Sequence, residues 1–209
     1  EFNEAQVQEL ALSSMPLVTV DHPFPGRPCV ASENTQGMES LVRHVVSLGH
    51  QKIAMVYGSP SAATTLRVNS FLKVMAASGL QVPQAYLVES LYHNPGAVRR
   101  GVEQLLKLED RPSCILLPDD FASLGGMEAI QAMGLSIPQD ISIAGFDGVP
   151  VLQMLQPRLT TVAQDTARIG QEAARLLIAQ IEDPDTRQVD ITPVPTTLLP
   201  GDTVARYPS

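Results

Sequence analysis

The stretch IPQDISIAGFD, at residues 137–147, decides the fold class of this chain. Its centre, residues 141–145, is a mostly apolar run interrupted only by Ser142, as expected for a strand that is covered on both faces. The run ends in Phe146 and Asp147, which set a ring and an acid together directly after a buried strand. Ligands of open α/β sheets bind beyond the carboxyl ends of the strands, so Asp147 is a candidate ligand contact.

Similar apolar runs alternate with amphipathic stretches along the rest of the chain. The strand candidates are residues 17–20, 53–57, 85–88, 114–117, 141–145 and 194–199. Apolar residues at the i, i+3, i+4, i+7 spacing of a helix face predict helices within residues 38–48, 68–75, 98–106, 124–133 and 173–181. This alternation is typical of repeated βα units, so the predicted class is α/β with parallel sheets.

The composition is that of a folded globular chain. The 209 residues are 44% hydrophobic and 17% charged, enough for one large domain or two small lobes. The longest apolar runs are far shorter than the about 20 residues that cross a bilayer, so we expect no membrane partner. The N-terminus is polar and does not resemble a secretory signal, which favours a cytoplasmic location.

The net charge of −8 argues against direct binding of nucleic acid by this segment, because phosphate contacts need clustered Lys and Arg. Cys29 and Cys114 lie 85 positions apart and lack the short spacing of zinc or redox sites, so both are predicted to be reduced thiols. His44 and His50 are six apart, which does not predict a metal-ligand pair.

Sequence patterns for nucleotide binding and nucleophilic catalysis are absent. The chain contains no GxGxxG, no GxxxxGK[ST] and no GxSxG. We therefore predict no cofactor, no metal, no catalytic residues and no enzymatic activity. An α/β enzyme that uses Asp119, Asp120 and Asp147 stays open as an alternative. Asp120 has a second interpretation, in which it caps the helix that follows residues 114–117.

Four segments of the chain resemble, in order and spacing, those of the LacI/GalR family of transcription regulators. They are ENTQG at 33–37, LGHQKIAMV at 48–56, IPQDISIAGFD at 137–147 and LTTVAQ at 159–164. The resemblance covers nearly the whole chain but begins late. It lacks the family's helix-turn-helix head, its hinge and roughly the first two βα units of its sensing core.

The resemblance implies a fold like that of the periplasmic binding proteins, with two α/β lobes, three crossings and a ligand cleft between the lobes. Residues 1–48 and 165–185 would then be a remnant of the N-terminal lobe. Residues 49–164 and 186–209 would form the C-terminal lobe.

The resemblance also implies the ligand-binding residues. Arg67 matches the family's cleft arginine, whose guanidinium can donate two hydrogen bonds to adjacent oxygens. Asp147 would accept from ligand hydroxyls, and Gln164 would act from the crossover. Asp119 stands where the family often carries asparagine, so a hydrogen-bond donor that helps to select the ligand is lost. Phe146 is the preferred candidate for stacking on a sugar ring, ahead of Tyr92 and Phe24.

The function implied is that of the effector-binding and dimerisation core of a transcriptional regulator. A small polar ligand, a sugar or sugar derivative, would control DNA binding by the absent helix-turn-helix domain. The partners expected are this effector, a second copy in a homodimer, and DNA only through the absent domain. The alternative is an exported solute-binding protein of a sugar uptake system, which would share the fold and the site chemistry.

Overall fold

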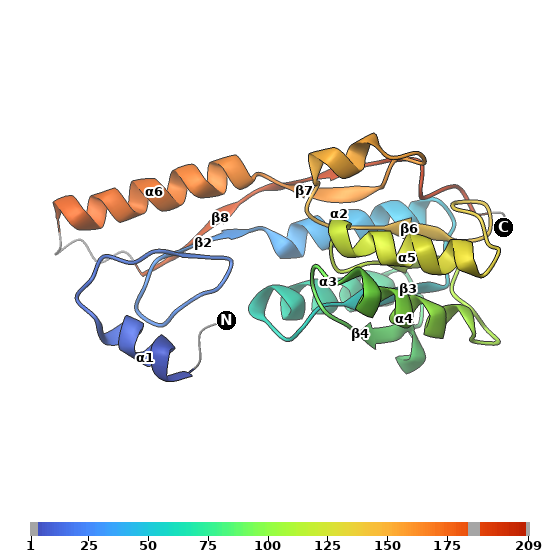
Figure 1. Ribbon diagram of the computed structural model, residues 1–209, viewed down its shortest axis with the longest axis horizontal. Coiled ribbons are helices and arrows are strands. Elements are labelled where there is room, and N and C mark those ends of the chain that lie inside the picture. The colour runs from blue at the N-terminus through green and yellow to red at the C-terminus, as the bar shows by residue number, and fades with distance from the viewer. Residues whose placement is uncertain (1–3, 184–188, 208–209) are drawn as a thin grey trace. The chain divides into compact units, whose positions relative to one another are not determined.

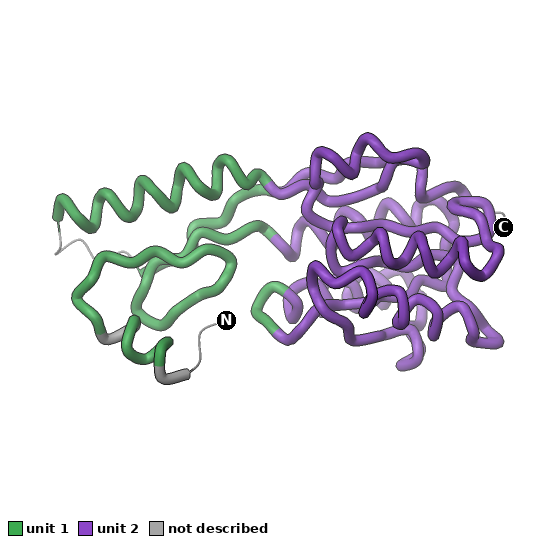
Figure 2. The backbone as a smooth tube through the Cα atoms, in the orientation of Figure 1, with its two compact units in different colours: residues 1–33, 61–63, 165–195 green, residues 34–60, 64–164, 196–209 purple. Residues whose placement is uncertain are grey.

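A computed structural model describes residues 4–183 and 189–207 of the chain. The chain divides into two compact units, each built from segments that are distant in sequence (Figure 2). Unit 1 comprises Glu1–Glu33, Ser61–Ala63 and Asp165–Pro195. Unit 2 comprises Asn34–Pro60, Thr64–Gln164 and Thr196–Ser209.

Unit 2 is built on a four-stranded parallel sheet with the order β4-β3-β5-β6 (Figure 1). Its strands are β4 (Leu87–Glu89), β3 (Ile53–Tyr57), β5 (Cys114–Leu116) and β6 (Ser142–Ala144). β3 and β5 pair from Ile53 opposite Cys114, and β5 and β6 pair from Cys114 opposite Ser142. Because all four strands are parallel, their carboxyl ends meet at one edge of the sheet.

Helices cover both faces of this sheet. The residues of β3 alternate between two apolar clusters, as the period of a strand requires. Ile53 and Met55 pack with α2 (Asn34–Ser47) and α3 (Ala62–Ala77). Ala54 and Val56 pack with α4 (Pro95–Leu106) and α5 (Asp120–Ala132), which also pack against each other. A parallel sheet between two helical layers explains why its strands are buried apolar runs.

A two-stranded antiparallel ribbon lies beside β6. It pairs β7 (Thr161–Gln164) with β9 (Thr196–Leu199). Single bridges join Ala144 to Thr160 and Asp147 to Ala163, so β7 and the residue before it run alongside the end of β6 and the loop that follows it. Short 3-10 turns at Gln84–Tyr86 and Pro150–Met154 complete the described elements of unit 2.

Unit 1 contains a three-stranded parallel sheet of β1 (Thr19–Val20), β2 (Cys29–Ser32) and β8 (Ile191–Val194). The long helix α6 (Thr166–Glu182) packs on this sheet, and α1 (Glu4–Leu12) precedes it in sequence. Four buried apolar side chains form its core cluster: Val30, Ile169, Leu176 and Val194. In the part of the chain that the structure describes, no helix is long and apolar enough to cross a membrane.

The α/β class with parallel sheets is confirmed, and a helix lies at each of the five predicted places. The division into units differs from the predicted boundaries at three points: α2, β8 and the short segment Ser61–Ala63, which was expected in the second lobe and falls in unit 1. Helix α2 was expected in the first lobe, but its apolar face joins the core of unit 2 around Phe71. Strand β8 was expected in the second lobe, yet it pairs with β2 of unit 1, and Pro195 separates it from β9.

Candidate functional site

Polar side chains gather at the carboxyl edge of the unit 2 sheet. Tyr92 and His93 follow β4, Asp119 follows β5, and Asp147 follows β6. Arg67 reaches this edge from α3. The parallel strand order brings these residues together although the sequence separates them by up to 80 positions.

Arg67 is the centre of this group and is only 6% exposed. Its Nε donates to Oδ1 of Asn34 at 2.7 Å, and its Nη1 donates to the carbonyl oxygen of Pro118 at 3.0 Å. Its Nη2 lies 4.0 Å from Oδ1 of Asp147. A buried guanidinium with partners on three sides is fixed in position, because each lost contact would leave a desolvated polar group.

Phe146 lies under Arg67. The guanidinium carbon is 3.6 Å from the centroid of the ring, a cation–π arrangement, and Phe146 is fully buried in the core that α2 and α3 cover. The structure therefore corrects the expectation that this ring stacks on a bound sugar, since the ring has no exposed surface. Its role here is to support the arginine.

Asp147 has a strained backbone, with a φ of 116°. Left-handed conformations of this kind are unfavourable for residues with a side chain. Two hydrogen bonds hold it: its amide donates to the carbonyl of Val162 at 2.8 Å, and its carbonyl accepts from the amide of Gln164 at 3.1 Å. Strain that the surrounding structure maintains clusters at functional sites, which makes this loop a candidate site by geometry.

The carboxylate of Asp147 is partly exposed, with 23% of the side chain accessible. Nε2 of Gln164 donates to its Oδ1 at 2.8 Å. Burial raises the pKa of Asp147 to about 7, and the charges of Asp119 and Asp120 add to the rise, while Arg67 opposes it. The group therefore changes its charge near neutral pH, where a ligand that donates hydrogen bonds would favour the ionised form.

Asp119 differs from Asp147 in being fully buried. It is the N-cap of α5, since its Oδ1 accepts from the amide of Ala122 at 2.7 Å, and its Oδ2 accepts from the amide of His93 at 2.8 Å. The cap had been predicted at Asp120, one residue later. Both oxygens of Asp119 face the protein, so its predicted contact with a ligand has no surface to act through.

Asp120 is also fully buried, in the first turn of α5. Its Oδ1 accepts from the hydroxyl of Thr161 at 2.5 Å, and its Oδ2 accepts from the amide of Val149 at 2.8 Å. Burial raises its pKa to about 6, although these hydrogen bonds oppose the rise. The residue thus joins the loop after β6 to the ribbon strand β7.

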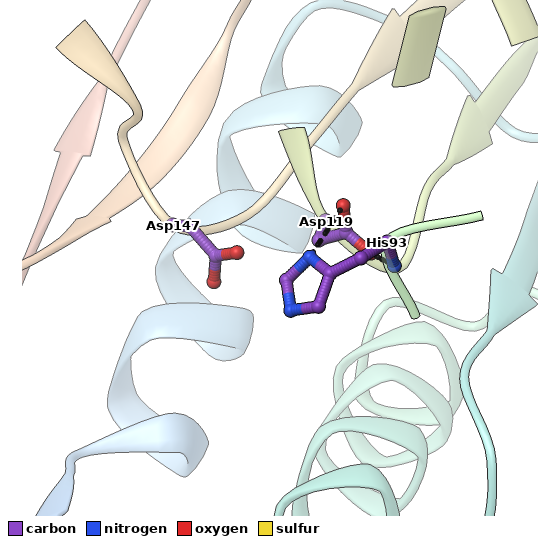
Figure 3. A group of neighbouring side chains, drawn as sticks. All are labelled: His93, Asp119 and Asp147. Carbon is purple, nitrogen blue, oxygen red and sulfur yellow. Dashed lines mark hydrogen bonds and ion pairs between the residues drawn. The ribbon is translucent and has the colours of Figure 1, made fainter. Parts of the chain in front are cut away.

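Figure 3 shows His93, Asp119 and Asp147 together, with the imidazole next to Asp119. Each offers one ligand atom within 4.8 Å of the others, so by distance the three could hold a metal ion. Asp119 already accepts from two backbone amides, and the guanidinium of Arg67 lies beside Asp147. These contacts favour a hydrogen-bonding role for the group, since a cation would have to compete with Arg67.

Two residues of this edge, Asn34 and His93, were missed as site residues by the sequence reasoning, and Tyr92 was named only as an alternative to Phe146 for stacking. Asn34 opens α2 inside the quoted 33–37 segment, and only the fold shows that it accepts from Arg67. Tyr92 bonds to Thr64 through its hydroxyl at 2.8 Å. His93 lies in no motif; its one sequence signal is its place shortly after a strand.

The chain matches the periplasmic binding protein-like domain family over residues 42–204. The chain belongs to this family. A curated relative, the ribose operon repressor of Haemophilus influenzae, is 28% identical over 194 residues, which are 91% of this chain and 58% of the repressor. This chain therefore spans little more than half the length of that relative.

Solved structures of regulators have the same fold. A LacI family regulator from Mycobacterium smegmatis has a TM-score of 0.88 at 25% identity, over 98% of this chain and 76% of that chain. A LacI family regulator from Enterococcus faecium, solved with bound ribose, has a TM-score of 0.84 at 22% identity, over 98% of this chain and 75% of that chain. The resemblance to LacI/GalR regulators, and with it the periplasmic binding protein-like fold, is confirmed.

Proposed function

We propose that this chain is the effector-binding core of a transcriptional regulator and that the carboxyl edge of the unit 2 sheet binds a sugar or sugar derivative. One observation carries the proposal. Asp147, partly exposed and strained, accepts from Gln164 and lies beside the buried Arg67. A carboxylate that is held in place this way can accept from two neighbouring hydroxyls of a polyol.

The relatives support a carbohydrate as the ligand. The repressor from Haemophilus influenzae is named for the ribose operon, and the Enterococcus faecium structure holds ribose. The site offers the carboxylate oxygens of Asp147 and the planar amide of Gln164, held in place beside Arg67, which suit a ligand rich in hydroxyls. Tyr92, whose side chain is half-buried, could supply the ring face that Phe146 does not.

The regulatory part of the proposal follows from the family. A net charge of −8 argues against DNA contact by this chain, so DNA would be bound by a separate helix-turn-helix segment. Ligand binding would act by favouring one conformation of the core over another, in proportion to its difference in affinity for the two. A homodimer on symmetric half-sites is part of the same proposal.

The test is ligand binding by calorimetry at pH 8 with a panel of D-ribose, D-glucose and D-galactose. We expect at least one sugar to bind, and Asp147→Asn to weaken it about tenfold or more, because the amide replaces one acceptor by a donor. Asp110→Asn is the matched control, since Asp110 pairs only at the surface of unit 2 with Lys52. Equal affinities of the wild-type protein and Asp147→Asn would remove Asp147 from the site.

A further inference from the structure

His93 is an exposed side chain that the protein holds at two points. Its backbone is left-handed, with a φ of 52°, and its ring is 70% exposed. Its amide donates to Oδ2 of Asp119 at 2.8 Å, and its Nδ1 lies 3.5 Å from Oδ1 of the same carboxylate. Exposed histidines on loops ordinarily rotate freely, so anchoring by one buried acid sets this ring apart.

Asp119 is itself unable to turn away from His93. It caps α5 through the amide of Ala122 and is fully buried behind the imidazole. The N-cap of α5, the loop after β4 and the imidazole of His93 are therefore joined through the carboxylate of Asp119. The structure around β5 thus fixes where the imidazole after β4 points (Figure 3).

We infer that His93 is a further ligand-binding residue of this edge, oriented by Asp119 as a positioning residue, and that the two make the site select neutral polyhydroxy ligands over anionic ones. The inference rests on the proposed function and names its ligand class. With Nδ1 facing the carboxylate, the proton of the neutral ring belongs on Nδ1. Nε2, on the other side of the ring from Nδ1, then carries a lone pair and can accept a hydrogen bond from a ligand hydroxyl.

The charges of the surrounding groups support this selectivity. Two carboxylates, Asp119 and Asp120, lie close enough to Asp147 to add to the rise that burial causes in its pKa. The facing cation is Arg67, which is 6% exposed and directs its donors to Asn34 and Pro118 inside the protein. An anionic phosphate or carboxylate group of a ligand would lie against the negatively charged carboxylate oxygens at this edge and be repelled. The hydroxyl groups of a neutral sugar can donate hydrogen bonds to the same oxygens.

The experiment compares three matched ligand pairs by calorimetry at pH 8. They are D-ribose with D-ribose 5-phosphate, D-glucose with D-glucose 6-phosphate, and D-galactose with D-galacturonate. The wild-type protein should bind the best neutral sugar at least about tenfold more tightly than its anionic counterpart. His93→Ala should weaken that neutral sugar about fivefold to tenfold, the range of one lost hydrogen bond. His22→Ala, an exposed histidine of unit 1, should leave the Kd unchanged.

A nitrogen NMR spectrum of the imidazole separates ligand contact from a structural role. Saturation with the neutral sugar should shift the Nε2 resonance of His93 and leave that of His22 in place. Asp119→Asn keeps a cap oxygen but removes the charge that faces Nδ1, so the ratio of the two ring tautomers should change. An unchanged ratio would show that Asp119 caps α5 and does not orient the ring.

The results that would contradict these expectations overturn different claims. A wild-type protein that binds no sugar of the panel would overturn the proposed function. Sugar binding that His93→Ala leaves unchanged, or tighter binding of the anionic partner, would overturn only the inference about His93. Loss of sugar binding after treatment with EDTA would assign His93, Asp119 and Asp147 to a metal ion and would also overturn it.

Discussion

The loops that follow β5 and β6 begin alike and serve different purposes. Each comes after a buried parallel strand, and each carries an aspartate at the same edge of the sheet. Asp119, after β5, is fully buried and caps a helix. Asp147, after β6, precedes a short 3-10 turn that it does not cap, and it keeps part of its carboxylate exposed in a strained backbone. The element that follows the strand therefore decides whether the acid stabilises the fold or faces a ligand.

This comparison predicts a separation of effects between the two loops. Changes in the β5 loop should lower stability first, because its acid satisfies buried amides. Substitutions in the β6 loop should first alter ligand binding and its dependence on pH. The reason is that burial disfavours the charged form of Asp147. Arg67 contacts both loops, through Pro118 and Asp147, so it should show both effects.

The largest expected effect is that of Arg67→Met. It leaves the carboxylate of Asp147 and the oxygens of Asn34 and Pro118 without their buried donor. We expect the free energy of unfolding to fall by about 3–5 kcal/mol, the range for breaking a buried ion pair. Urea denaturation measures it, with Arg99→Met on the surface of α4 as control. A loss as small as that of the control would contradict the central place given to Arg67.

The next effect is that of Asp119→Ala in the β5 loop. It removes the cap of α5 and leaves the amide of His93 without its acceptor, for a loss of about 2–3 kcal/mol. Asp165→Ala removes the exposed cap of α6 in the same way and should cost about 1 kcal/mol. If both variants lost the same stability in urea, the bond from Asp119 to the β4 loop would contribute nothing.

Asp147→Asn in the β6 loop should raise the free energy of unfolding at high pH, whereas the two preceding substitutions should lower it. The pKa of Asp147 is raised from its ordinary value to about 7, so the folded protein binds this proton more tightly than the unfolded chain. The carboxylate therefore costs stability above pH 7, and the cost fades as the pH falls toward 4. We expect the variant to be about 1–3 kcal/mol more stable than the wild type at pH 8.

The same denaturation series at pH 5 provides the check on Asp147→Asn, because the advantage of the variant should then be less than half of its value at pH 8. Asp120, whose pKa is also raised, is present in both proteins and cancels in the difference. A variant that is less stable than the wild type at pH 8 would show that Arg67 and Gln164 more than offset the cost of burial.

The smallest effect is expected for Gln164→Leu, which removes one hydrogen bond to the carboxylate of Asp147. The loss of orientation should weaken the best neutral sugar about threefold to tenfold. Gln153→Leu, which removes a bond to the carbonyl of Leu159, is the control and should leave the Kd unchanged. A stronger effect than that of Asp147→Asn would reverse the roles given to the two residues.

Much of the fold follows from the sequence because its signals are local. The apolar runs at β3, β5 and β6 and the helical spacings of α2 to α6 are each contained in one short segment. The unit to which α2 belongs is not local, since it depends on which core its apolar face meets. The same holds for β8, a mostly exposed strand whose partner β2 was not predicted.

The candidate site could be predicted in part. The strand ends indicated Asp147, the resemblance to LacI/GalR regulators implied Arg67 and Gln164, and the structure brings these three together. The exposure of a side chain depends on tertiary packing, which explains why Phe146 and Asp119 were expected at the surface of the site and are buried. His93 could not be found from sequence, because its anchor lies 26 positions away.

The dependence of sugar affinity on pH tests the central claim most directly, that an ionised Asp147 receives the ligand. Calorimetry of the best neutral sugar from pH 5.5 to 8.5 should show the Kd falling about tenfold between pH 6 and pH 8, with the change centred near the pKa of about 7. The change should be smaller in Asp147→Asn. A Kd that stays constant across this range in the wild type, or an equally large pH dependence in Asp147→Asn, would contradict the account.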